Sequence, residues 1–142
     1  MEDRNYQVDI RRHGNYLHAV VTGPNTAETV VAYMGDIRQA CDANDCHRVL
    51  IEEKLEGPRF DEMEIFSLIT EGSSDALGFF EAIAYVDEQQ DFEVVKFAET
   101  VAVNRGIPIA VFSSVPDAEN WLRHRREDAP EQDIFTGEDR DD

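Results

Sequence analysis

The chain has 142 residues and a formal net charge of −18 at pH 7. A chain of this length suits a single domain, which can bury roughly two-thirds of the surface that the unfolded chain exposes. An acidic surface repels phosphate backbones and anionic lipid headgroups, so the charge argues against nucleic-acid binding. The sequence has no apolar run of membrane-spanning length and no signal-peptide pattern, so we expect a cytoplasmic protein without membrane insertion.

The negative charge divides unevenly along the chain. Residues 127–142 contribute −7 of the total, and their Pro, Gly and charged content is typical of a disordered segment. We therefore expect one ordered domain over residues 1–126, followed by an acidic disordered tail.

The first predicted element is an antiparallel β-hairpin. Residues 6–13 and 16–23 both alternate in side-chain character. Gly14-Asn15 lies between them, and this dipeptide suits the positive φ angles of a tight hairpin turn.

A helix and a central strand follow the hairpin. Asn25 and Glu28 have the spacing of a capping box, and the apolar residues after them repeat at helical intervals as far as Ala43. Residues 47–52 contain an unbroken Val-Leu-Ile centre, which is typical of a strand covered on both faces. We expect this strand to lie in the middle of the sheet.

The second predicted helix begins after Gly57-Pro58. Asp61 is its expected cap, with Glu64 completing the capping box, and the helix should continue to about Glu71. Residues 72–74, Gly-Ser-Ser, are expected to end the helix and form a loop.

The remaining predicted elements are a strand at 79–86, a helix at 91–105, a strand at 107–112 and a helix at 116–125. The complete order is β-β-α-β-α-β-α-β-α. Because strand-helix-strand units cross over with a right hand, they should build a mostly parallel central sheet. The predicted fold class is therefore α/β, a single domain in which βαβ units follow an N-terminal β-hairpin.

This order of elements resembles the STAS-like domains related to bacterial anti-sigma-factor antagonists, and in particular their SpoIIAA-like branch, which is often grouped with lipid-binding Sec14-type domains. The similarity spans roughly residues 6–125 and is carried by packing and turn residues. These residues are Val49-Leu50-Ile51-Glu52, Ala82 to Asp87, Phe97-Ala98 through Arg105-Gly106, Val111-Phe112 and Ala118 to Leu122.

The resemblance implies a regulatory module that binds a protein partner near the second helix, around residues 56–64. Antagonists that switch by phosphorylation have a Ser in the turn after the third strand, where the helix N-terminus stabilises the phosphate. The corresponding turn here, residues 54–61, contains no Ser or Thr. The usual phosphorylation switch is therefore not expected.

Ligands of open α/β sheets tend to lie beyond the carboxyl ends of the parallel strands. This rule selects the residues after three predicted strands. The resemblance adds the loop that is expected to meet a partner. The candidate partner or ligand surface comprises Glu53, Lys54, Glu56, Arg59, Asp61, Glu64, Asp87, Ser113 and Ser114, and the rule also selects Glu52 and Glu88. Solvated loop acids and helix caps are the simpler interpretation of these residues.

The sequence contains no catalytic or cofactor-binding motif, such as a nucleophile elbow or a phosphate-binding glycine loop. We therefore expect no catalytic residues, no cofactor and no metal. Cys41 and Cys46 are separated by four residues rather than the two of a zinc hook, and we expect both to be small buried side chains.

Three functions stay open at this stage. The first is a non-enzymatic regulatory or protein-interaction module, whose partner could be a second copy of the chain in a homodimer. The second is a carrier or sensor of a small apolar or lipid-like ligand, suggested by the aromatic residues Phe60, Phe66, Phe79, Phe80, Phe92 and Phe97. The third is an enzyme that uses Ser113, Ser114 and Asp87.

Overall fold

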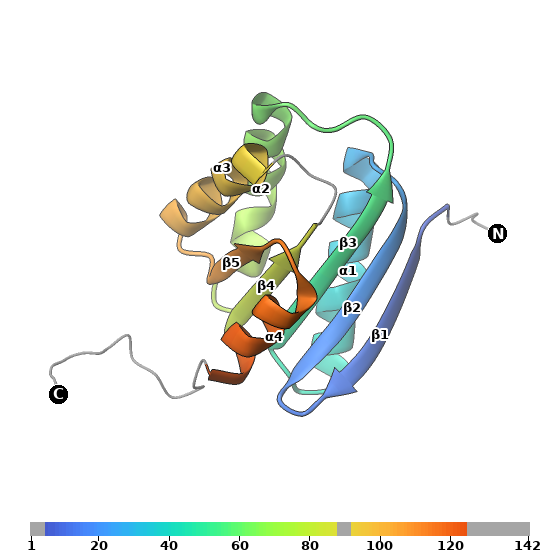
Figure 1. Cartoon of the computed structure of the whole chain (residues 1–142), viewed down its shortest axis with the longest axis vertical. Coiled ribbons are helices and arrows are strands. Elements are labelled where there is room, and N and C mark those ends of the chain that lie inside the picture. Colours follow the sequence, from blue (N-terminus) through green and yellow to red (C-terminus); the bar gives the residue numbers. More distant parts are fainter. Residues whose placement is uncertain (1–4, 88–91, 125–142) are drawn as a thin grey trace, which may run out of the picture.

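A computed structural model describes residues 5–87 and 92–124 of the chain. They form a single sheet with helices on both faces (Figure 1). The acidic tail expected over residues 127–142 and the candidate residue Glu88 lie outside the described residues.

The sheet has five strands in the spatial order β1-β2-β3-β4-β5. β1 pairs antiparallel with β2, and the other neighbouring strands are parallel. The predicted α/β class, N-terminal hairpin and central third strand are confirmed. The strands are β1 (Gln7–His13), β2 (Tyr16–Pro24), β3 (Arg48–Glu56), β4 (Ala82–Val86) and β5 (Ile109–Phe112), and the helices are α1 (Ala27–Ala43), α2 (Glu62–Ala76), α3 (Phe92–Asn104) and α4 (Val115–His124).

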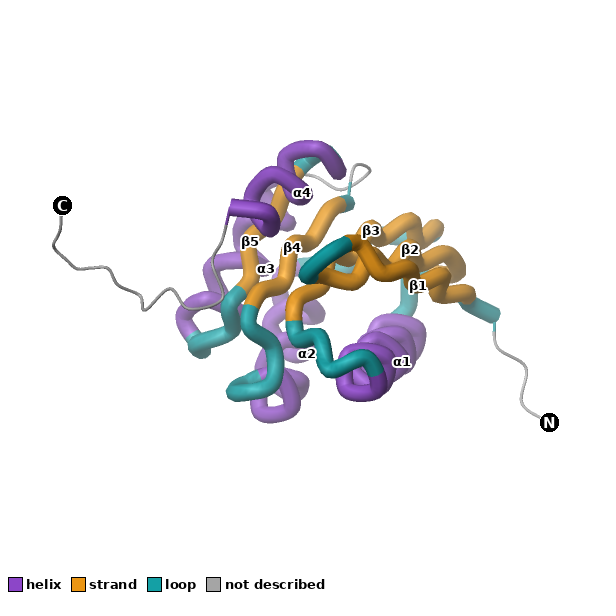
Figure 2. Tube along the Cα trace, turned by 90° about the horizontal axis from the view of Figure 1, so that it is seen from below, coloured by secondary structure: helices purple, strands orange, loops and turns teal. Residues whose placement is uncertain are grey.

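The two faces of the sheet are covered by different helices, as Figure 2 shows. Of the helices in residues 5–87 and 92–124, only α4 lies on one face, where its Ala118 and Leu122 pack with Leu50 of β3. α1, α2 and α3 belong to the other face. Because side chains alternate along a strand, β3 contributes Leu50 to the first face and Ile51, Glu53 and Leu55 to the second.

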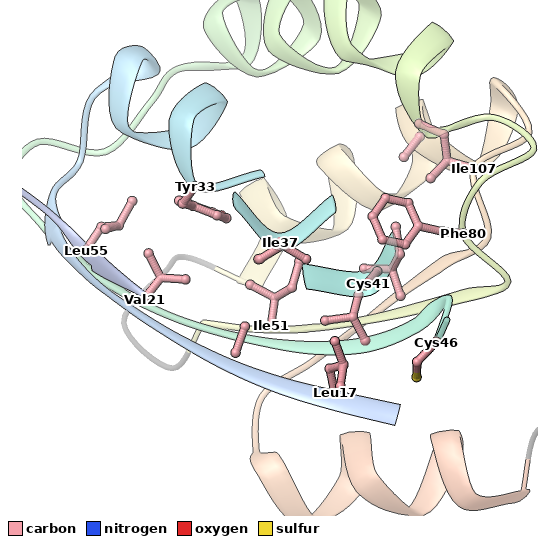
Figure 3. Packing of buried hydrophobic residues seen from close by; sticks show 14 residues of the cluster. Leu17, Val21, Tyr33, Ile37, Cys41, Cys46, Ile51, Leu55, Phe80 and Ile107 are labelled. Carbon is pink, nitrogen blue, oxygen red and sulfur yellow. The ribbon is translucent and has the colours of Figure 1, made fainter. Parts of the chain in front are cut away.

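α1 supplies much of the larger core (Figure 3). Tyr33, Ile37 and Cys41 recur every four residues, so they lie on one side of the helix and point at the sheet. Each is 2% exposed or less. Cys41 and Cys46 are buried and are not joined in a disulfide, which confirms their expected role as small buried side chains.

The N-cap of α1 differs from the prediction by one residue. Thr26, rather than Asn25, accepts a hydrogen bond from the backbone N–H of Thr29 at 3.1 Å. Asn25 instead donates its side-chain amide to the carbonyl of Pro58 at 2.8 Å, and its backbone N–H to the carbonyl of Glu56. Tertiary hydrogen bonds therefore engage the residue that the local pattern assigned to the cap.

β3 and α2 both extend past their predicted ends. β3 continues to Glu56 because β2 pairs with it as far as Pro24, so residues 53–56 are strand and not loop. α2 continues to Ala76, and the hydroxyl of Ser73 donates to the carbonyl of Thr70 within the helix. The prediction that residues 72–74 form a helix-ending loop is wrong.

The predicted strand at 79–86 begins three residues late, at Ala82. The backbone N–H groups of Phe79 and Phe80 both point to the carbonyl of Ala76, at 3.2 and 3.4 Å. These two N–H groups pair with a carbonyl at the C-terminal end of α2, so they are not available for hydrogen bonds between strands.

Replacing Thr26 with Ala should lower the free energy of unfolding by about 1 kcal/mol, because the capping hydrogen bond to Thr29 is lost. Urea denaturation followed by circular dichroism measures this loss. Thr26→Ser is the matched control and should keep most of the stability. Equal stability of Thr26→Ala and the wild type would contradict the assignment of the cap.

Candidate functional site

A cavity of about 520 Å³ lies between the sheet and the helices α1, α2 and α3. α1 packs on β1 and β2, α2 packs mainly against α3, and α1 and α2 also contact each other. Most of the side chains that line this space are apolar. Among them are Met34, Ile51, Phe60, Ile69, Phe80 and Ile83.

The cavity reaches the surface between α1 and α2. Val31 of α1 lines the cavity and is 64% exposed. Gly35 of α1 also lines it and is exposed, as are Glu71 and Gly72 of α2. These four residues, which we call the cavity mouth, come from facing helices, so a molecule can enter without unfolding the sheet.

Two glycines of the mouth leave room that side chains would fill. A Cβ atom added to Gly35 or to Gly72 would meet no atom within 4 Å beyond its own local backbone. Both residues lie inside helices and neither has a positive φ. Glycine in a helix interior destabilises the helix by about 0.5–1 kcal/mol relative to alanine. Neither backbone conformation nor packing within the chain requires glycine here.

The cavity is also lined by the buried carboxylate of Glu53 in β3, which is 5% exposed. The hydroxyl of Tyr85 in β4 donates to its Oε1 at 2.5 Å. The hydroxyl of Tyr33 in α1 donates to its Oε2. We call these three residues the polar floor. The two tyrosines replace part of the hydration that the carboxylate loses on burial.

A second buried carboxylate lies next to the polar floor. Asp87 follows β4, is 6% exposed and pairs with Arg59 at 4.0 Å between Oδ2 and Nη1. Arg59 also donates to the carbonyl of Leu55 at 3.3 Å. The loop after β3 is thereby linked to the end of β4.

Burial raises the pKa of Glu53 to about 7. The hydrogen bonds from Tyr33 and Tyr85 oppose this rise, and the negative charge of Asp87 adds to it. Burial also holds the pKa of both tyrosines well above their usual value, and the charge of Glu53 acts in the same direction. The tyrosines are therefore hydrogen-bond donors at any physiological pH.

Of the nine candidate residues selected from the sequence, Glu53, Arg59 and Asp87 come together beside the cavity. Lys54 is exposed and pairs with Glu52, whose side chain lies near that of His18.

The other candidates occupy different surroundings. Asp61 and Glu64 form the predicted capping box of α2 and are exposed. Ser114 accepts a hydrogen bond from the backbone N–H of Asp117 at 3.3 Å, within the first turn of α4. Ser113 and Glu56 are exposed.

Sequence reasoning missed four residues of the site. Tyr33 shares a face of α1 with Ile37 and Cys41, a four-residue spacing that marks it as buried. Tyr85 is two residues after Ile83 in β4, so both side chains face the same side of the sheet. The glycines Gly35 and Gly72 have no local signal that separates them from ordinary helix interruptions.

Within residues 5–87 and 92–124, no three His, Cys, Asp or Glu side chains gather in a way that could hold a metal ion. None of the helices described is both long and apolar enough to cross a membrane.

The chain has an α/β fold of the SpoIIAA-like kind, with a largely apolar cavity on the larger face of its sheet. The chain is similar to the crystal structure of an anti-sigma factor antagonist from Mycobacterium paratuberculosis, with a TM-score of 0.52 and 11% identity over 83% of this chain and 94% of that one. It is also similar to an uncharacterised protein from Shewanella loihica PV-4 with a SpoIIAA-like fold, with a TM-score of 0.50 and 18% identity over 86% of this chain and 98% of that one. No protein-family model and no curated protein matches the sequence. The resemblance inferred from the order of elements is thus confirmed at the level of the fold.

Glu53→Gln should change how the stability of the protein depends on pH. A carboxyl group whose pKa is 4.5 in the unfolded chain and about 7 in the folded one stabilises the fold below pH 4.5, and this contribution is lost as the pH rises through 7. The wild type should therefore lose up to about 3 kcal/mol more than Glu53→Gln between pH 4.5 and pH 8.

Urea denaturation of both proteins at several pH values measures this difference. Glu71→Gln, which changes an exposed carboxylate of the same cavity, is the control and should follow the wild type. Parallel pH profiles for the wild type and Glu53→Gln would show that Glu53 keeps an ordinary pKa.

Proposed function

We propose that this protein is a non-enzymatic carrier or sensor of a small, largely apolar molecule. The observation that carries the proposal is the cavity of about 520 Å³ with a mouth between α1 and α2. Ligand sites of proteins are typically apolar hollows of roughly 300–1,000 Å³ with a few fixed polar groups. The size, the lining and the polar floor agree with this description.

Energetic cost supports a ligand as the reason for the cavity. Apolar side chains around an unfilled space lose packing contacts, which destabilises the fold. The helix glycines Gly35 and Gly72 add to this cost. A bound apolar molecule would offset both effects by restoring the contacts and using the room that the glycines leave.

The hydrogen bonds of the site favour binding over catalysis. Glu53 accepts hydrogen bonds from the hydroxyls of Tyr33 and Tyr85, and the hydroxyl of Ser114 caps α4. An activated nucleophile would instead need a neighbouring base within hydrogen-bonding reach. The third function suggested by the sequence, an enzyme using Ser113, Ser114 and Asp87, therefore has the least support.

The neutral fluorescent probe N-phenyl-1-naphthylamine should bind the wild-type protein with an increase in emission. Gly35→Leu should weaken this binding by about tenfold or more, because the new side chain enters the space at the mouth. Gln39→Leu is the matched control, since Gln39 is exposed on the same helix and does not line the cavity. It should bind the probe as the wild type does.

A second variant at the same position separates the effect on binding from the effect on stability. Gly35→Ala should raise the free energy of unfolding by about 0.5–1 kcal/mol, because a Cβ atom meets nothing in the unliganded protein. Failure of the wild type to bind the probe, or equal binding by Gly35→Leu and Gln39→Leu, would contradict the proposed function.

A regulatory protein-interaction module is the second candidate. Met63 and Phe66 of α2 are 77% and 45% exposed, and their three-residue spacing places them on one side of the helix. They lie beside the loop that the resemblance implies as the partner surface, and the fold is similar to that of an anti-sigma factor antagonist. An exposed apolar pair of this kind suits a protein partner, including a second copy of the chain.

Met63→Glu should abolish retention of a partner from the native cell on the immobilised protein. Val103→Glu is the control, because Val103 is exposed to a similar extent, 51%, on a different helix. Sedimentation of the purified protein distinguishes a second copy from another partner. Identical sets of retained proteins for all three forms would count against this surface.

A further inference from the structure

We infer that the ligand carries a cationic amino group at one end of an apolar body, and that this group is held by the carboxylate of Glu53. The inference rests on the proposed function and names the ligand class that the cavity selects. The apolar body of the ligand would contact the apolar lining between the helices. Its charged end would contact the polar floor.

The first argument is the balance of charge at the floor. Glu53 and Asp87 are both buried beside the cavity, at 5% and 6% exposure. Among the described residues, the cation that pairs with these carboxylates is Arg59, whose guanidinium lies 4.0 Å from Asp87. Two buried carboxylates beside one guanidinium favour uptake of one more positive charge.

In the unliganded protein, that positive charge is a proton. Burial and the neighbouring charge of Asp87 raise the pKa of Glu53 to about 7, so this carboxyl group is partly protonated at neutral pH. An ammonium group can replace the proton and make a charge-assisted hydrogen bond. Each oxygen of Glu53 already accepts one tyrosine hydroxyl, and the carboxyl group also hydrogen-bonds with Asp87, so one acceptor position of the four that a carboxylate offers is left for the ligand.

The second argument is what the cavity would reject. A fatty-acid carboxylate would add a third negative charge beside Glu53 and Asp87 in a poorly solvated place, which is strongly unfavourable. The formal charge of −18 on the whole chain acts in the same direction and attracts cationic molecules toward the mouth. A neutral alcohol can donate to Glu53 but leaves the charge uncompensated.

The other charged groups that line the cavity have partners or lie at its rim. Arg38 of α1 is exposed, and its guanidinium lies 4.4 Å from the ring centre of Phe79. Glu71 of α2 is exposed at the mouth. Glu99 of α3 accepts the backbone N–H of Val111 at 2.9 Å and the ammonium of Lys96 at 2.5 Å. Among the described residues, Glu53 is thus the buried carboxylate best placed to receive an ammonium group.

The test uses three probes with the same alkyl chain and different polar ends: decylamine, 1-decanol and decanoate. Each is used to displace N-phenyl-1-naphthylamine from the full-length wild-type protein, below its micelle-forming concentration. Decylamine should displace the probe at a concentration about tenfold or more below that of 1-decanol, and decanoate should be weakest. Equal potency of the three, or preference for decanoate, would overturn the inference while leaving the proposed function intact.

Two further measurements tie the preference to Glu53. Glu53→Gln should lose about tenfold or more in affinity for decylamine and keep its affinity for 1-decanol, whereas Glu81→Gln, at an exposed carboxylate that does not line the cavity, should retain the preference. In the wild type, the affinity for decylamine should rise about tenfold from pH 6 to pH 8, as Glu53 ionises with its pKa of about 7.

The outcomes separate the two proposals. If no probe binds the wild type, the proposed function fails. If probes bind but decylamine is no more potent than 1-decanol, or its affinity does not change between pH 6 and pH 8, the inferred ligand class fails. Because the wild-type ranking and its pH profile need no substitution, the inference can be tested even if Glu53→Gln folds poorly.

Discussion

The burial of the Glu53 carboxylate in the central strand constrains the whole larger face of the sheet. A carboxylate at this depth is tolerable only if its oxygens are hydrogen-bonded, and the donors come from two different elements, Tyr33 of α1 and Tyr85 of β4. The two hydrogen bonds tie α1 and β4 to the central strand at the polar floor of the cavity.

The fold could be predicted from the sequence because the order of its helices and strands is marked by periodic patterns of apolar residues. Alternation in the N-terminal hairpin and helical spacing in α1 identified the first elements, and the capping box of Asp61 located the start of α2. The errors occurred where long-range pairing decides a boundary. Pairing with β2 extends β3 to Glu56, and the carbonyl of Ala76 engages the N–H groups of Phe79 and Phe80.

The site was accessible only in part. The rule of carboxyl strand ends selected Glu53 and Asp87, and the loop implied as a partner surface supplied Arg59, which lies with them. The rule also selected Lys54, Ser113 and Ser114, whose surroundings differ. A cavity is a property of how helices pack, and no local pattern reports the space between α1 and α2. The interpretation of the acids as solvated loop residues does not hold for Glu53, because β3 continues past it and its side chain is buried.

Gly35 and Gly72 lie at the cavity mouth, whereas Glu53 is held by Tyr33 of α1 and Tyr85 of β4, so different residues determine the room at the mouth and the charge at the floor. Substitutions at the helix glycines can shorten or reshape the space without altering a residue that holds Glu53. Descendants of one ancestral chain could in this way come to bind longer or shorter ligands of the same charge. They could equally come to bind ligands of a different charge and the same length. Diversification of this kind requires no change in topology.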